Sequence, residues 1–380
     1  MSERRILIIG GGPAGTFAAL AAKKRDPGAS IVLLTREHCE PYEKPPLSKA
    51  VLLGAAEPDA APIAGPAGVR SHDVALEVRA DCAAIDRGNR SVVLTDGRRL
   101  RYDALVIATG SVPRELPFLP NGTPSVHYLR SEADARALKS ALRASRRLLV
   151  VGGGLIGLEV AASAAMLGLA VPGMSGVDIR VDRSLSSVHG PADGGIAVAT
   201  AGGDQIVADL AVVGTGSIPE TALASAAGLA TDDGVVVDAQ CRTSDPAIFA
   251  AGDCVRFPGP AGLVRLENWI HAQDQGTVAG RNAAGASDAY AAVPSFWSEQ
   301  YDLYIQGVGW PASAGTRVRR PLDGNRLLVF DVKEGRMIHA MGINVQRDIA
   351  MARRLIERGA MVDPIALADP AQPLAQMLKR

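Results

Sequence analysis

The chain has 380 residues, of which 47% are hydrophobic and 21% are charged, a balance typical of a folded protein with more than one domain. The 40 basic residues are balanced by 40 acidic ones, and aromatic residues make up only 4%. The electrostatic footprint and the stacking platforms of a nucleic-acid-binding protein are therefore missing, and we expect no nucleic-acid partner.

The chain begins with the pattern of a strand, a glycine-rich turn and a helix. An apolar run at residues 6–9 precedes a helix that we expect over about residues 16–24. Such a turn lets the backbone approach a pyrophosphate, and the helix N-terminus adds amide donors. A tight turn in an α/β fold without a nucleotide is the alternative. The motif is G-x-G-x-x-G, formed by Gly10, Gly12 and Gly15.

A second strand, predicted at residues 31–34, completes the signature of a dinucleotide-binding unit. It ends near Glu37, about 20 positions beyond the glycines, which is the spacing expected of a residue that hydrogen-bonds the adenosine ribose. Arg36 is predicted to lie beside the adenine. A later apolar strand leads into Thr109 and Gly110.

The same succession of motifs returns in the middle of the chain. An apolar run at residues 148–151 precedes a helix predicted over about residues 155–167. The sequence A-T-G-S-V-P at 108–113 likewise returns as G-T-G-S-I-P at 214–219. Two dinucleotide-binding units in series explain both repeats. The second G-x-G-x-x-G consists of Gly152, Gly154 and Gly157.

The second unit is shorter than the first. Gly10 and Gly110 are 100 residues apart, whereas Gly152 and Gly216 are 64 apart. Part of the difference is a Pro/Ala-rich insertion in the first unit. The rest follows the second helix, where residues 171–176 contain proline and glycine, which do not continue a central strand. We expect this unit to lack most of one strand, its acidic end and the next helix.

The composition changes after Asp253. A helix is predicted near residues 266–284, alternating strand-like segments follow, and a last helix is predicted near residues 347–358. Strands followed by helices indicate a small α+β domain. The predicted domains are a cofactor-binding domain of residues 1–110 with 234–290, a shortened second dinucleotide-binding domain of residues 111–233, and a C-terminal domain of residues 291–380.

Further motifs give the chain a specific resemblance. They are P-P-L-S-K at Pro45–Lys49, G-D at Gly252–Asp253 and F-W-S-E-Q-Y-D at 296–302. With the two glycine loops, they resemble the FAD-dependent NAD(P)H:ferredoxin reductases, the flavoproteins that supply electrons to Rieske oxygenases and bacterial cytochromes P450. The resemblance covers nearly the whole chain. It implies an α/β fold with two tandem Rossmann-like domains of the glutathione-reductase type and a small C-terminal α+β domain.

The resemblance assigns FAD-binding roles to individual residues. Ala14 and Gly15 would contact the pyrophosphate, and Lys49 would approach the flavin ring, where a cation stabilises negative charge. Asp253 would accept hydrogen bonds from the ribityl hydroxyls, and Arg130 would contact FAD. Each assignment has an alternative. Lys49 could be a solvated lysine, Arg130 a surface arginine and Asp253 a turn-forming residue, and the two tryptophans named next could belong to the core. Backbone or aromatic contacts with the cofactor are implied for Cys82, Trp269 and Trp297.

The resemblance also places Glu159, which follows the second glycine loop, beside the nicotinamide of NAD(P)H, where it would pair with Lys49. A helix-face charge favoured by the helix dipole is the alternative for Glu159. Lys49 and Glu159 are the predicted catalytic residues. Because the second unit is short, we also weigh an FAD-binding oxidase or dehydrogenase subunit that has lost nicotinamide use. A regulatory module without a cofactor is the third hypothesis.

The four cysteines show neither C-x-x-C nor metal-ligand spacing, so we expect no metal and no redox-active cysteine pair. The electron acceptor would then be a separate ferredoxin-type [2Fe-2S] protein. Unpaired thiols and the lack of a visible signal peptide favour the cytoplasm. The uncharged run at residues 160–177 contains glycine and proline, and we interpret it as a buried helix and a loop, with no membrane span. A monomer or a homodimer fits the sequence.

Overall fold

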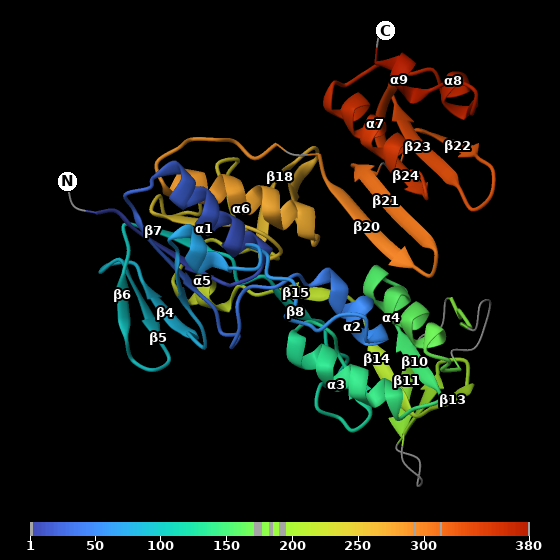
Figure 1. Cartoon of the computed structure of the whole chain (residues 1–380), viewed down its shortest axis with the longest axis horizontal. Helices are drawn as coiled ribbons and strands as arrows, with labels where there is room; N and C mark the ends of the chain where they lie inside the picture. Colours follow the sequence, from blue (N-terminus) through green and yellow to red (C-terminus); the bar gives the residue numbers. More distant parts are fainter. Residues whose placement is uncertain are drawn as a thin grey trace. The chain divides into compact units, whose positions relative to one another are not determined.

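The chain forms two compact units in the computed structural model, Met1–Tyr290 and Ala291–Arg380 (Figure 1). The structure describes residues 3–170, 177–181, 185–189, 195–291, 293–311 and 314–378. Each unit has hydrophobic core residues of its own. Among the described residues, no helix is both long enough and apolar enough to cross a bilayer.

A parallel five-stranded sheet forms the centre of the first unit. Every neighbouring pair of its strands is parallel. Both faces of such a sheet are covered, which is why the apolar run at residues 6–9 is buried throughout. The first three strands of this sheet in chain order lie next to one another, and the two later strands lie on the other side of the first, as in dinucleotide-binding folds. In sheet order they are β17 (Ile248–Ala250), β7 (Ala104–Ile107), β1 (Arg5–Ile9), β2 (Ser30–Leu34) and β3 (Ala75–Glu77).

Two helices, α1 (Pro13–Arg25) and α6 (Trp269–Ala283), pack directly against each other beside this sheet (Figure 1). A Cβ atom added to Gly276 would lie 2.2 Å from the carbonyl oxygen of Ala14, and one added to Gly280 would lie 2.0 Å from that of Ala18. The two helix backbones therefore touch, and only glycine fits at these positions of α6. This contact fixes the first turn of α1 relative to α6.

A second parallel sheet belongs to the middle of the chain. Its strands, in the order β10, β14 and β9, are parallel. The helix α4 (Leu155–Met166) follows β10, and its Val160 shares a core with Leu138 of α3 (Glu132–Arg143) and Leu52 of α2 (Ala50–Leu53). An antiparallel sheet of β11, β12 and β13 completes this part. The strands are β9 (Val126–His127), β10 (Leu148–Val151), β11 (Leu185–His189), β12 (Ile196–Thr200), β13 (Gln205–Ala208) and β14 (Leu210–Val213).

The strand that should follow α4 beside β10 is reduced in the described residues to one parallel bridge between Arg147 and Ala170. The Ala170 amide donates to the carbonyl oxygen of Arg146 at 2.7 Å. The predicted interruption at residues 171–176 lies outside the described residues. No helix lies between α4 and β11 in the part of the chain that is described. At the end of α4, Met166 is left 56% exposed, as expected where a covering element is missing.

The remaining elements of the first unit are short. The antiparallel pairing of β8 with β15 joins the segments that follow β7 and β14, and so connects the two repeated motifs. These elements are η1 (Pro45–Ser48), η2 (Val69–His72), β4 (Cys82–Asp86), β5 (Ser91–Leu94), β6 (Arg99–Arg101), β8 (Ser111–Pro113), β15 (Ser217–Pro219), α5 (Ala222–Ala226), β16 (Val235–Val236), β18 (Val255–Gly259) and β19 (Gly262–Val264).

The second unit is an antiparallel five-stranded sheet packed against helices. Its core includes Phe330 of the sheet and Leu355 of the longest helix, both fully buried. The strands, in sheet order, are β20 (Ser295–Gln300), β21 (Leu303–Gly309), β24 (Arg336–Ile343), β23 (Leu327–Lys333) and β22 (Thr316–Pro321). The helices are α7 (Gln346–Glu357), α8 (Pro364–Ala368) and α9 (Leu374–Met377).

The predicted fold class is confirmed. Two parallel sheets, each with a glycine loop after its first apolar strand, are followed by a small α+β unit. The predicted helices at about 16–24, 155–167 and 347–358 are observed as α1, α4 and α7 within three residues at each end. The boundaries of the predicted domains 1–110 with 234–290 and 111–233 stay predictions, because these residues belong to one compact unit.

Candidate functional site

Four loops of the first unit meet at one edge of its parallel sheet. They follow the carboxyl ends of β1, β2, β7 and β17. Because parallel strands end at the same edge, this is where an open α/β sheet binds its ligand. The loops carry the predicted cofactor-binding residues Gly10–Gly15, Arg36 and Glu37, Thr109 and Gly110, and Asp253.

The first glycine loop forms a cradle for an anion. Gly10 has φ +114°, and a Cβ atom there would lie 2.1 Å from the carbonyl oxygen of Ala108, while a Cβ on Gly15 would lie 1.8 Å from that of Gly10. A Cβ on Gly12, in contrast, would meet no atom within 4 Å. No side chain caps the N-terminus of α1, and its first turn carries no acidic residue. An open helix N-terminus of this kind suits a pyrophosphate such as that of FAD.

The second glycine loop repeats this geometry. Gly152 has φ +109°, and a Cβ on Gly157 would lie 2.3 Å from the carbonyl oxygen of Gly152. A Cβ on Gly153 would again meet no atom within 4 Å, and one on Gly154 would approach the carbonyl oxygen of Gly214 only to 3.9 Å. No side chain caps α4 either. The chain therefore has two glycine loops of matching geometry, each with an uncapped helix N-terminus.

Arg130 and Asp253 are brought together from distant parts of the chain. A guanidinium nitrogen of Arg130 lies 3.2 Å from the Asp253 carboxylate, which also accepts a hydrogen bond from the Ser111 hydroxyl at 3.2 Å. Burial raises the pKa of Asp253, and the positive charge of Arg130 opposes this. A largely buried carboxylate with a guanidinium beside it provides the acceptors and donors that a polyhydroxyl chain requires, so these residues fit the ribityl end of FAD.

Glu37 is already hydrogen-bonded by two residues that the sequence analysis missed. Its carboxylate accepts from the Tyr42 hydroxyl at 2.5 Å and from the Lys44 ammonium at 3.0 Å. Burial acts to raise the pKa of Glu37, but Lys44 and Tyr42 together hold it below its usual value. Glu37 is thus held as a carboxylate at the end of β2. Arg36, beside it, is exposed.

The predicted catalytic pair is present. The Lys49 ammonium lies 3.1 Å from the Glu159 carboxylate, and their side chains are only 16% and 6% exposed. The buried Ser48 hydroxyl also donates to Glu159. The Ser163 hydroxyl of α4 donates in turn to the Ser48 carbonyl at 2.8 Å. Residues of the P-P-L-S-K motif are therefore fixed directly against the helix of the second glycine loop. Ser48 was missed because the family resemblance implied only Lys49 as a partner of Glu159, and no local pattern links Ser48 to a residue 111 positions away.

The other predicted residues occupy separate places. Thr109 donates to the carbonyl oxygen of Glu220 at 2.6 Å, which ties the two repeated motifs together. Trp269 is the first residue of α6 and contacts Phe17 edge to face, with ring centroids 5.7 Å apart. Cys82 lies on β4, and burial raises the pKa of its thiol to about 12. Trp297 lies on β20 of the second unit.

Family comparisons agree with this geometry. The model of the pyridine nucleotide-disulphide oxidoreductases matches residues 4–175 and 173–276, and the model of the reductase C-terminal domain matches residues 295–378. The fold and the two glycine loops thus define a protein of the pyridine nucleotide-disulphide oxidoreductase class.

Similar proteins identify the branch of this class. The ferredoxin–NAD(+) reductase component of the anthranilate 1,2-dioxygenase system from Burkholderia cepacia is 40% identical over 407 residues, covering all of both chains. Rhodocoxin reductase from Rhodococcus erythropolis is 37% identical, covering 96% of this chain and 92% of its own. A crystal structure of the covalent putidaredoxin reductase–putidaredoxin complex matches with a TM-score of 0.93 and 31% identity, covering 100% of this chain and 99% of that one. The chain belongs to the ferredoxin–NAD(+) reductase family, as its resemblance predicted.

The comparisons also agree with a shortened second unit. The alignment with the Burkholderia relative extends over 407 residues, whereas this chain has 380, so the relative has residues that this chain lacks. The match to the family model is broken into two parts that meet at residues 173–175. That break falls where the sequence analysis expects a strand and a helix to be missing.

Proposed function

We propose that this chain is the flavoprotein reductase of an electron-transfer system. It would bind FAD at the carboxyl edge of the first sheet, take electrons from NAD(P)H bound at the second glycine loop, and pass them to a ferredoxin-type [2Fe-2S] protein. When bound, FAD supplies the chemistry, because a flavin accepts a hydride and releases electrons one at a time. The observation that carries the proposal is the contact of Lys49 with Glu159, which joins the P-P-L-S-K segment to the helix that follows the second glycine loop.

The residues of the first unit have separate tasks in holding FAD. The uncapped N-terminus of α1 would bind the pyrophosphate, with Ala14 in its first turn. Glu37, kept ionised by Lys44, would accept hydrogen bonds from the ribose hydroxyls. Asp253 and Arg130 would bind the ribityl chain. Thr109, Gly110, Cys82 and Trp269 stay predicted contacts, as does Trp297.

Lys49 and Glu159 would orient the nicotinamide. A buried carboxylate can accept a hydrogen bond from the carboxamide, and a nearby ammonium stabilises negative charge that develops on the ring system next to it. Pairing holds the two side chains against each other at a buried position beside α4. Ser48 adds a second hydrogen bond to the same carboxylate.

The anaerobic visible spectrum tests the proposal. The purified protein should be yellow, with about one FAD per chain, and excess NADH under argon should bleach the flavin absorbance within seconds. A yellow protein that is not bleached by millimolar NADH would instead support an FAD-binding oxidase or dehydrogenase subunit without nicotinamide use. A colourless protein that takes up no added FAD would contradict both functions.

A ferredoxin-type partner is tested by turnover. The related crystal structure is that of a covalent complex of putidaredoxin reductase with putidaredoxin. We therefore expect NADH-dependent cytochrome c reduction to rise steeply when a [2Fe-2S] ferredoxin is added. Equal rates with and without the ferredoxin would contradict this partner. We also propose a cytoplasmic location, because all four cysteines are free thiols.

A further inference from the structure

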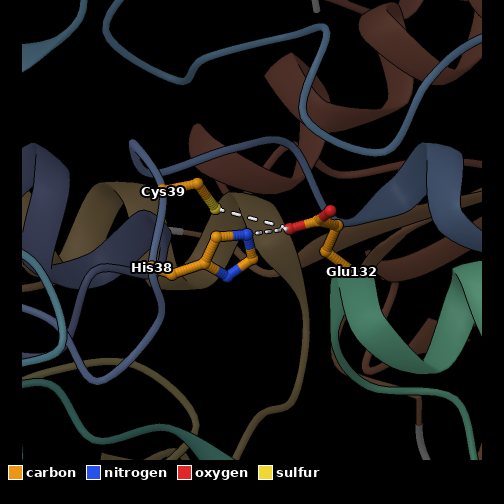
Figure 2. A group of neighbouring side chains, drawn as sticks. All are labelled: His38, Cys39 and Glu132. Carbon is orange, nitrogen blue, oxygen red and sulfur yellow. Dashed lines mark hydrogen bonds and ion pairs between the residues drawn. The ribbon is translucent and has the colours of Figure 1, made fainter.

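His38, Cys39 and Glu132 form a cluster outside the predicted FAD and nicotinamide contacts (Figure 2). Their donor atoms all lie within 4.8 Å of one another. His38 and Cys39 lie in the loop after β2, and Glu132 is the first residue of α3. From this cluster we propose a binding site for a zinc-like divalent cation, with an imidazole nitrogen, a thiolate and a carboxylate as ligands.

Two of the three distances between the donor atoms match tetrahedral coordination. Ligand bonds of about 2.0–2.3 Å place neighbouring donors of a tetrahedral zinc ion about 3.3–3.8 Å apart. The Cys39 Sγ lies 3.6 Å from an oxygen of Glu132, and His38 Nε2 lies 3.5 Å from the same oxygen. Figure 2 shows both side chains directed toward this carboxylate oxygen. An ion can bind between the three groups with small rotations of the side chains.

The charges around the cluster favour a cation. Glu132 is 4% exposed, and its other carboxylate oxygen is held by Arg136 at 2.5 Å, which leaves one oxygen for the ion. The charge of Arg136 is itself offset by ion pairs with Glu57 and Asp59. Burial and the negative charges of Glu132 and Glu37 raise the pKa of the Cys39 thiol to about 11, and a cation bound beside these carboxylates would offset their charge.

The three donor groups determine which metal ions the site would bind. A thiolate with an imidazole prefers zinc, or cobalt as its spectroscopic substitute, over magnesium or calcium, which require oxygen ligands. His38 is 57% exposed, so solvent can reach the site and supply a fourth ligand. Three protein ligands and a water complete a tetrahedral site.

The site is connected to the adenosine end of the proposed FAD site. Glu37 directly precedes His38 in the chain. The Tyr42 hydroxyl donates to Glu37 at 2.5 Å and accepts a hydrogen bond from the backbone amide of Glu132 at 2.8 Å. An ion bound to His38, Cys39 and Glu132 would therefore fix the loop that carries Glu37 against α3.

Cobalt titration of the metal-free, FAD-containing protein tests the site. We expect Co²⁺ to produce tetrahedral absorption in the red, where oxidised flavin does not absorb, with an endpoint of one ion per chain. Zinc should displace the cobalt and remove this absorption. If saturating Co²⁺ produces no tetrahedral spectrum, the proposal is wrong. The readout requires neither NADH nor ferredoxin, so its failure would leave the proposed function intact.

Single substitutions then test the ligands. His38→Ala and Cys39→Ser should each weaken zinc binding by about tenfold or more, as measured by competition with a chromophoric chelator. His72→Ala is the matched control, because His72 is another exposed histidine of the first unit and lies outside the cluster. Flavin content and circular dichroism identify any variant that fails to fold. Zinc affinity that is unchanged in both ligand variants, or lowered equally in His72→Ala, would overturn the assignment.

Discussion

Glu159 accepts hydrogen bonds from both residues at the end of the P-P-L-S-K motif, and Ser48 is the neutral donor. A hydrogen bond to a buried charged group contributes about 1.5–3 kcal/mol. We expect Ser48→Ala to slow flavin reduction by NADH about tenfold or more in stopped-flow experiments, because the carboxylate loses its fixed position, while flavin content stays near one per chain. Ser140→Ala, at an exposed position of α3, should react like the wild type. Unchanged kinetics in Ser48→Ala would show that Lys49 alone positions Glu159.

His271 gives the first unit a pH-dependent stability. It is 1% exposed, its ring stacks on Phe257 at 4.9 Å, and burial lowers its pKa to about 4. Between about pH 6.5 and pH 4 the unfolded chain binds a proton at this residue and the folded chain does not, so stability falls as the pH falls. From pH 7.5 to pH 5 the loss is about 2 kcal/mol.

Urea unfolding at the two pH values measures this contribution. His271→Phe keeps an aromatic ring against Phe257 but cannot titrate, so its free energy of unfolding should fall about 2 kcal/mol less than that of the wild type between pH 7.5 and pH 5. His72→Ala, at an exposed position, should keep the wild-type difference. The same pH dependence in His271→Phe and the wild type would show that His271 is not the group responsible.

At the scale of elements, the two glycine loops have the same geometry but are predicted to bind different ligands. A Cβ on Gly15 would lie 1.8 Å from a carbonyl oxygen, and one on Gly157 would lie 2.3 Å from the equivalent oxygen. Gly15→Ala should therefore lower the FAD content of the purified protein, whereas Gly157→Ala should keep its FAD and raise the KM for NADH about tenfold or more. Loss of flavin in Gly157→Ala with normal NADH binding in Gly15→Ala would reverse the assignment.

The same elements show what the sequence could and could not predict. The glycine loops and their helices were predicted because residues close together in the chain determine them. The family resemblance implied the Lys49–Glu159 pair. It did not predict three further contacts, those of Ser48 with Glu159, of Lys44 with Glu37 and of Cys39 with Glu132. The spacing rules for cysteine and histidine likewise do not identify the metal site proposed above, whose third ligand lies 93 residues beyond Cys39 in the chain. These groups come into contact only when the chain packs, so no local sequence pattern predicts the contacts.

For the molecule as a whole, the unequal size of the two dinucleotide-binding halves determines which part of the nucleotide is recognised. The first sheet has five parallel strands with an ionised Glu37 at the end of β2. In the described residues of the second half, the corresponding strand is a single bridge at Ala170. Because its glycine loop and Glu159 are intact, we expect the nicotinamide and pyrophosphate to keep their contacts, whereas the described residues offer no matching acceptor for the adenosine ribose.

This asymmetry predicts a low preference for NADH over reduced nicotinamide mononucleotide, which lacks the adenosine half. Loss of one hydrogen bond to a charged group costs about 1.5–3 kcal/mol of binding free energy, which lowers the affinity about 10- to 100-fold. The ratio of kcat/KM for the two donors should therefore be about ten- to a hundredfold smaller in this chain than in the Burkholderia relative assayed beside it, which has residues that this chain lacks. Steady-state kinetics with ferricyanide as the acceptor measure the ratio without a ferredoxin. A ratio equal to that of the relative would mean that other residues of this chain hold the adenosine as firmly as an intact strand does.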